Sequence, residues 1–322
     1  MFPIIDVTAW EQLNKEQMGT KPKFWCQDHS GNEFLFKESR SHAGEHWSEK
    51  IAAEIAGELG LPHAKIELAT CAGKNGTLSK NFLSPTEPSS LIHGNELLFE
   101  HDPAYRKEDP NFHLAQHTLD RIIAGLMRSE AVLPQGFTFP QNVHTACDLF
   151  VGYLLLDALI GNTDRHHANW AVIISPCRNG THVVKIAPTF DHASSLGREL
   201  TDQRRTAKLT AEGMRYIPGR QSRRDQTVVG YLEKDDGRSR IFASEYDDKP
   251  LRPLQVFESV RVKLPDAAEA WINRLATIDL TRFQCIISQV PPEVMSQPMR
   301  DFSLCLIDLN RKALITRTFH YA

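Results

Sequence analysis

The sequence predicts an α+β protein of two lobes, with a small β-rich N-lobe followed by a larger helical C-lobe. Residues 1–90 contain two β-hairpin patterns and one amphipathic helix pattern. A segment rich in proline and serine, 84–90, separates them from the rest of the chain. Beyond that segment, apolar stretches with helical spacing prevail, so we place the N-lobe at 1–90 and the C-lobe at 91–322.

The first elements of the N-lobe follow from turn residues and apolar spacing. Apolar segments 23–26 and 33–37 flank a polar turn that contains Gly31, which predicts a β-hairpin. The segment 45–59 has apolar residues four positions apart, the spacing of one buried helix face. Gly60 directly after it is typical of a helix C-terminus, where a left-handed residue closes the last turn.

One more hairpin precedes the helical lobe. Its strands are expected at 64–71 and 77–83, around a turn that contains glycine. A loop-and-strand region at 161–196 interrupts the C-lobe, and the polar stretch 198–252 has few apolar runs. The helices of the C-lobe include segments expected at 112–130, 143–159, 265–276 and 299–314.

The composition is that of a soluble globular protein rather than a fibrous or disordered one. Of 322 residues, 41% are hydrophobic and 24% are charged, and the formal net charge is −3. A chain so balanced is no general binder of polyanions, so we expect no direct nucleic-acid partner and no membrane partner. One local exception is the segment 198–224, with eight basic and three acidic residues. It suits docking of an acidic or RNA-bound protein, and equally a solvated loop.

Nothing in the sequence predicts export or membrane insertion. The most apolar run, 149–156, is bounded by Asp148 and Asp157 and is far shorter than the roughly 20 residues that span a bilayer. The N-terminus lacks the basic and apolar segments of a secretory signal. The six cysteines are scattered without a CxxC pair, which favours reduced thiols over a zinc knuckle. We therefore expect a cytoplasmic protein.

Three polar side chains of the C-lobe have the types that phosphoryl transfer requires. Asp164 and Asn169 lie five residues apart in a segment too rich in Gly, Asn and Asp to be helical. Asp191 follows a strand pattern at 183–186. One carboxylate can accept the proton of an acceptor hydroxyl, and an amide oxygen with a second carboxylate can hold Mg²⁺ against phosphates. Protein kinases place an Asp, an Asn and a second Asp in this order.

These motifs resemble those of the HipA-like serine/threonine kinases, bacterial toxin-type enzymes with a protein-kinase-like fold. The segment 161–169, GNTDRHHAN, resembles the G-N-x-D-x-H-x-x-N signature of that family, and 186–191, IAPTFD, resembles its metal motif. The resemblance implies that Asp164 is the catalytic base of an ATP- and Mg²⁺-dependent kinase. It implies further site residues: Asn169 and Asp191 as Mg²⁺ ligands, and His166 as a brace of the loop beside the cofactor.

The resemblance also implies a phosphate-binding lysine in the N-lobe. Lys37 ends an apolar strand, where its ammonium group would neutralise phosphate charge. In the family, such a lysine usually pairs with a carboxylate from a helix. Glu49 matches that partner best, while Glu45 and Glu54 stay open as alternatives.

Two more segments would contact the nucleotide if the resemblance holds. A loop with Gly19, Thr20 and Lys21 resembles the phosphate loop of the family, whose backbone N–H groups cradle phosphates. The backbone of the segment that joins the lobes is expected to meet the adenine edge, as kinase hinges do. That segment consists of Asn81, Phe82 and Leu83.

The resemblance carries expectations about partners and control. It implies a protein substrate, of a kind related to translation, and an antitoxin as a candidate partner. The chain resembles the shorter members of the family, which lack an additional N-terminal subdomain. Several relatives autophosphorylate a serine near the phosphate loop. The nearby candidates here are Thr8 and Thr20, and Ser39 and Ser41 are alternatives.

Three alternatives to this hypothesis stay open. His166, His167 and His192 near the two aspartates suit a Zn²⁺- or Mn²⁺-dependent phosphohydrolase, but no HxH or HExxH motif completes a ligand set. A non-catalytic pseudokinase module is disfavoured, because the lysine, the asparagine and both aspartates are all present. A small-molecule kinase of the same fold uses the same Asp–Asn–Asp set.

Overall fold

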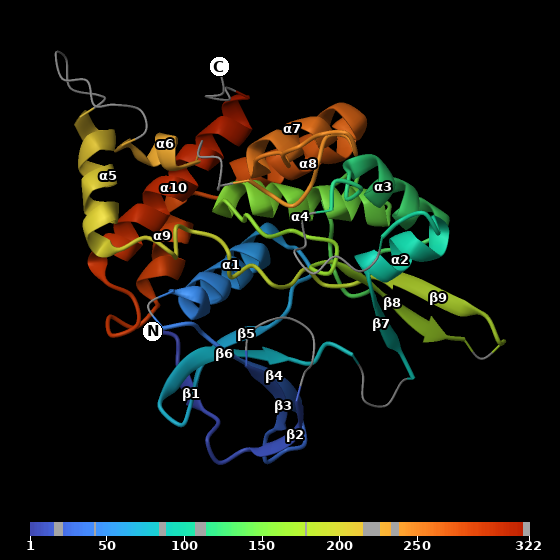
Figure 1. Ribbon diagram of the computed structural model, residues 1–322, viewed down its shortest axis with the longest axis horizontal. Helices are drawn as coiled ribbons and strands as arrows, with labels where there is room; N and C mark the ends of the chain where they lie inside the picture. The colour runs from blue at the N-terminus through green and yellow to red at the C-terminus, as the bar shows by residue number, and fades with distance from the viewer. Residues whose placement is uncertain are drawn as a thin grey trace.

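The computed structural model forms a β-sheet lobe and a helical lobe that pack against each other (Figure 1). The six-stranded sheet lies at the bottom of the view, with helix α1 above it and most of the other helices beyond α1. This arrangement confirms the expected α+β fold class. The structure describes residues 1–15, 22–41, 43–83, 88–106, 114–177, 179–214, 226–232 and 238–317.

The N-terminal sheet is a twisted antiparallel sheet with one parallel edge pair. Its strand order is β1-β5-β6-β4-β3-β2, and only β1 runs parallel to its neighbour, β5. Both predicted hairpins are confirmed, as β3–β4 and β5–β6. Gly31 has a φ of 82° in the first turn, a conformation that glycine adopts without cost. The strands are β1 Ile4–Asp6, β2 Glu11–Lys15, β3 Lys23–Gln27, β4 Glu33–Glu38, β5 Ile66–Cys71 and β6 Lys74–Lys80.

Helix α1, Glu45–Leu59, joins the two lobes. It contacts β5 and β6 on one side and α4 and α9 on the other. Its apolar residues Trp47, Ile51 and Ile55 are fully buried in a core that continues into the helical lobe. The helix ends as predicted at Gly60, whose left-handed backbone lets its N–H group bond to the carbonyls of the last turn. Because α1 packs against both lobes, it can carry a polar side chain to the boundary between them.

A small second sheet follows the segment that joins the lobes. Its strands are β7 Ser90–His93, β8 Ala171–Pro176 and β9 His182–Ile186, and β7 pairs with β8. Helix α2, Gly94–His101, begins directly after β7. A Cβ atom at Gly94 would lie 2.2 Å from the ring of Trp170 and 2.6 Å from the backbone oxygen of His167. Glycine at this position therefore allows α2 to pack against the loop that carries Asp164 and Asn169.

Helices α3, α7, α8 and α10 contact the central helix α4, Ala146–Ile160, while α5, α6 and α9 contact α10. Nearly every residue of α4 is buried, which is typical of a central helix that is apolar on all sides. Among the helices that the structure describes, none is long and apolar enough to cross a membrane. The other helices of this lobe are α3 Leu119–Arg128, α5 Asp202–Met214, α6 Val228–Leu232, α7 Pro253–Lys263, α8 Pro265–Ala276, α9 Leu280–Ser288 and α10 Gln297–Thr316.

Several element boundaries differ from the sequence-based expectation. Helix α3 begins at Leu119 rather than near 112, because the Thr118 hydroxyl caps it by accepting a hydrogen bond from Arg121 N. Strand β6 begins at Lys74, so the turn before it is shorter than expected. The polar stretch 198–252 contains α5, which has so many charged residues that its apolar spacing does not predict a helix.

Candidate active site

The predicted catalytic loop begins where α4 ends. Gly161 adopts a left-handed conformation with a φ of 65°, which turns the chain sharply out of the helix. The next residue, Asn162, is buried and donates from Nδ2 to Asp157 Oδ1 at 2.8 Å. Its Oδ1 accepts from Asp164 N at 3.1 Å. The Gly-Asn pair therefore fixes the backbone of Asp164 against the end of a buried helix.

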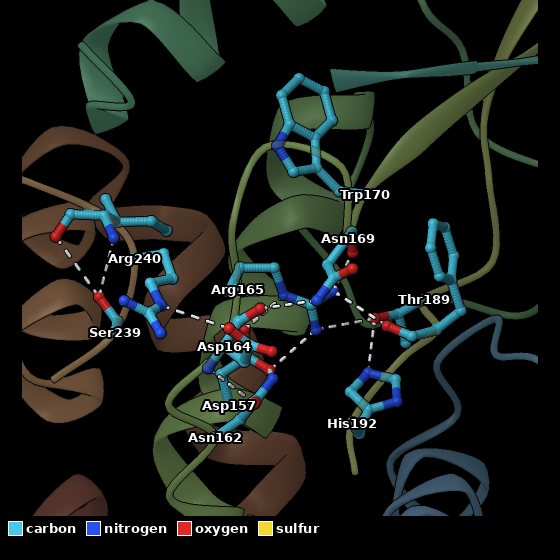
Figure 2. Close-up of polar contacts among 12 residues, drawn as sticks. Asp157, Asn162, Asp164, Arg165, Asn169, Trp170, Thr189, His192, Ser239 and Arg240 are labelled. Carbon is cyan, nitrogen blue, oxygen red and sulfur yellow. Dashed lines mark hydrogen bonds and ion pairs between the residues drawn. The ribbon is translucent and has the colours of Figure 1, made fainter. Parts of the chain in front are cut away.

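A buried arginine ties this loop to the segment that carries Asp191. Arg165 forms a bidentate ion pair with Asp157, at 2.7 Å from Nε and 2.8 Å from Nη2 (Figure 2). Its Nη1 donates to the backbone oxygens of Asn169 and Phe190, and its Nη2 donates to the Thr189 hydroxyl at 3.1 Å. One guanidinium group thus holds two loops, whose contacting residues Arg165 and Thr189 lie 24 positions apart in the sequence, at a fixed separation.

Breaking this pair is expected to destabilise the folded protein strongly. In an Asp157→Asn variant the Arg165 guanidinium, 1% exposed, loses its charged partner. Removing one partner of a buried ion pair typically costs about 3–5 kcal/mol. We expect urea unfolding to show a loss of this size relative to the wild type. An Asp266→Asn variant, on the exposed start of α8, serves as the control. A midpoint unchanged in Asp157→Asn would contradict the bracing role.

The Arg165 contacts place the loop that carries Asp164 and Asn169 beside the segment that carries Asp191. Asn169 Nδ2 donates to the backbone oxygen of Asp164 at 2.7 Å, which leaves the amide oxygen as its group for another ligand. Asp191 has a φ of 59°, a left-handed conformation that is uncommon for a residue with a side chain and is often found at functional sites. Burial raises the pKa of the Asp164 carboxyl above its ordinary value; Arg240 opposes that rise and Asp191 adds to it.

The predicted phosphate-binding lysine lies at the same place. Lys37 Nζ, on β4, is 3.3 Å from Asp191 Oδ2 and 3.8 Å from Glu49 Oε1 on α1. Burial lowers the pKa of the ammonium group, but the two carboxylates outweigh burial and hold that pKa above its ordinary value. Of the three candidate partners on α1, Glu49 is the one near Lys37, because Glu45 pairs with Arg198 and Glu54 pairs with Lys50.

The other predicted nucleotide contacts are placed only in part. The loop residues Gly19, Thr20 and Lys21 lie outside the described residues. In the joining segment, Asn81 donates to Glu33 and accepts from the backbone N–H of Leu83 at 3.0 Å. The Phe82 ring lies 6.2 Å from the ring of Phe190, directly before Asp191. These contacts seat the joining segment against the predicted metal loop.

The histidines of the site have separate partners instead of a shared metal centre. His166 Nδ1 accepts a hydrogen bond from the backbone N–H of Ala168 at 3.2 Å, and burial lowers the pKa of the His166 ring to about 3. His167 Nδ1 bonds to the hydroxyl of Tyr105, and His192 Nε2 to that of Thr189. The described part of the chain contains no group of three or more His, Cys, Asp or Glu side chains suited to a metal ion.

Sequence reasoning missed the side chains that support the site. Asp157 closes the apolar run of α4, and its burial beneath the loop became evident only from the fold. Arg165 lies inside the signature motif, at a position that the motif leaves unspecified. Arg240 lies in a polar stretch without a motif, and its Nε is 3.3 Å from Asp164 Oδ1. The only available signal was the acidic character of Asp157 and Asp164, since a buried carboxylate requires a partner.

The chain has a kinase-like fold of two lobes. Glu49 of α1 and the two loops that Arg165 joins meet where the lobes pack together. The chain resembles the Helicobacter pylori proinflammatory kinase CtkA, with 20% sequence identity, a TM-score of 0.70 and coverage of 98% of both chains. The chain is less similar to HipA of Shewanella oneidensis MR-1, which was solved in complex with HipB and operator DNA. That comparison has 12% sequence identity and a TM-score of 0.46, and it covers 96% of this chain and 66% of the HipA chain. No family model matches the sequence, and no curated protein matches it either.

Proposed function

We propose that the chain is an ATP- and Mg²⁺-dependent kinase of the HipA-like type, which transfers a γ-phosphoryl group to a Ser or Thr hydroxyl of a protein. The observation that carries the proposal is the meeting of Lys37 and Glu49 from the N-terminal lobe with Asp191, beside Asp164 and Asn169. A kinase needs this combination of a cation, a base and oxygen ligands at the boundary between its lobes.

The donor set fits Mg²⁺ better than a softer metal ion. Asn169 offers an amide oxygen and Asp191 a carboxylate, and hard oxygen ligands are the ones that Mg²⁺ prefers. The neighbouring imidazoles, which would attract Zn²⁺, bond to hydroxyl and backbone groups instead. Asn169 and Asp191 would hold the ion, which when bound offsets the negative charge of the phosphates.

The reaction follows from the roles of the protein groups. Lys37 would bind phosphate oxygens, and Glu49 would keep its ammonium group in position. Asp164 would accept the proton of the acceptor hydroxyl while the hydroxyl oxygen forms a bond to the γ-phosphorus. The bond between that phosphorus and the β,γ-bridging oxygen breaks, and ADP leaves with the electron pair. Positioning and charge stabilisation supply most of the rate in such a transfer.

Labelled ATP tests the proposal directly. The purified chain is incubated with γ-labelled ATP and Mg²⁺, alone and with cell lysate. Label on the protein itself, or on one lysate protein, is the expected result. Label on a small molecule only would favour the small-molecule kinase. Release of phosphate from phosphoesters without nucleotide would favour the hydrolase, and absence of nucleotide binding would favour the pseudokinase module.

A further inference from the structure

An arginine outside every sequence motif lies directly beside the predicted catalytic base. Arg240 Nε is 3.3 Å from Asp164 Oδ1, and its side chain is 31% exposed (Figure 2). The residue comes from the segment between α6 and α7, far from the catalytic loop in sequence. A cation at this distance from a base is either a structural partner or a group that acts on the substrate, and its surroundings distinguish the two.

The backbone of Arg240 is anchored to the catalytic loop through a buried histidine. Trp170, next to Asn169 in the chain, donates from its indole Nε1 to His117 Nε2 at 3.2 Å. Because an indole N–H can only donate, Nε2 is the acceptor and the proton of the neutral ring lies on Nδ1. That Nδ1 donates to Arg240 O at 2.9 Å, and Phe242 N donates to His117 O at 3.0 Å. The position of Arg240 is therefore coupled to that of Asn169.

The other cations around the site are bound to protein acceptors. Arg165 is fully buried and donates to Asp157, Thr189 and two backbone oxygens. Arg198 donates to Glu45 at 2.8 Å and to the hydroxyl of Ser194 at 3.1 Å. Arg240 differs, because only its Nε has an acceptor among the residues that the structure describes. Both of its Nη groups remain available to a ligand.

We propose that the Arg240 guanidinium binds the γ-phosphoryl group with its Nη donors while its Nε orients Asp164. This inference rests on the proposed kinase function and deepens it by assigning a substrate contact. A guanidinium matches two phosphate oxygens with parallel N–H donors. As the γ-phosphoryl group moves toward the acceptor oxygen, negative charge spreads over its equatorial oxygens beside Asp164. Arg240 supplies a positive charge beside Asp164, where that negative charge develops.

Nucleotide affinities of the full chain separate this contact from a structural role. Isothermal titration with Mg²⁺ compares a β,γ-imido analogue of ATP, which retains the γ-phosphoryl group, with ADP, which lacks it. In Arg240→Met we expect affinity for the analogue to fall about tenfold or more, the size of charged hydrogen bonds, with ADP affinity unchanged. Arg240→Lys keeps the positive charge but lacks the two parallel N–H donors. Its affinity for the analogue is expected to lie between those of the wild type and of Arg240→Met.

The control is Arg204→Met, which removes the same charge from an exposed position on α5 and is expected to change neither affinity. Thermal unfolding of all variants reports on folding, and Arg240→Lys serves if Arg240→Met does not fold. An equal loss of affinity for both nucleotides in Arg240→Met, or an unchanged preference for the analogue over ADP, would overturn the proposed contact and leave the kinase proposal standing. A wild-type chain that binds neither nucleotide would overturn both.

Discussion

An Asp164→Asn variant is expected to lose phosphoryl transfer by about 10³-fold while still binding the Mg²⁺ complex of ATP. An amide is nearly the same size as the carboxylate but does not take up the acceptor's proton, and general-base catalysis contributes about 10²–10⁴-fold. The backbone of residue 164 keeps its hydrogen bonds to the side chains of Asn162 and Asn169. The loop should therefore hold its shape in the variant.

Single-turnover transfer from labelled ATP measures the loss, and titration with the nucleotide measures the retained affinity. The matched control is Asp120→Asn, which removes a carboxylate from the exposed first turn of α3. The same rate in Asp164→Asn as in the wild type would remove Asp164 from the role of base. A combined loss of transfer and of nucleotide affinity would instead indicate that Asp164 supports binding.

Asp191→Asn is expected to weaken nucleotide binding itself. The carboxylate contributes a full negative charge to the predicted Mg²⁺ site, and it is also the closer of the two acidic partners of Lys37. Its removal weakens the hold on the ion and frees the lysine from one restraint. We expect the Mg²⁺ concentration that gives half-maximal nucleotide binding to rise by about tenfold or more, as a charged ligand contact contributes roughly 1.5–3 kcal/mol.

Nucleotide titrations at a series of Mg²⁺ concentrations test this expectation. Asp164→Asn serves as the matched comparison, because it removes a carboxylate from the same site without removing a predicted metal ligand. Identical Mg²⁺ dependence in Asp191→Asn and in the wild type would contradict the assignment of Asp191.

Local sequence patterns predicted the elements whose contacts are local. The β3–β4 hairpin and α1 follow from turn residues and from apolar spacing, and both formed within a few residues of the expected bounds. Local patterns do not predict strand β7, because it is short and its partner β8 lies far along the chain. Pairing of that kind depends on the assembled lobe rather than on the strand's own residues.

Some residues of the candidate site are likewise predicted by local sequence patterns, while others are placed by contacts between distant segments. Asp164 and Asn169 were recognisable because their spacing lies within one loop. The choice of Glu49 over its neighbours on α1 depended on packing, since Glu45 is taken by Arg198, a residue from the other lobe. Arg240 was beyond prediction, because its place is set by a hydrogen bond from His117 and not by any motif.

The most direct measurement of the central claim is a crystal structure of the chain with the β,γ-imido analogue of ATP and Mn²⁺, which substitutes for Mg²⁺ and gives an anomalous signal. We expect a Mn²⁺ peak within coordination distance of the amide oxygen of Asn169 and of a carboxylate oxygen of Asp191, with the triphosphate between Lys37 and Asp164. A nucleotide bound elsewhere, or a metal ion away from Asn169 and Asp191, would contradict the claim.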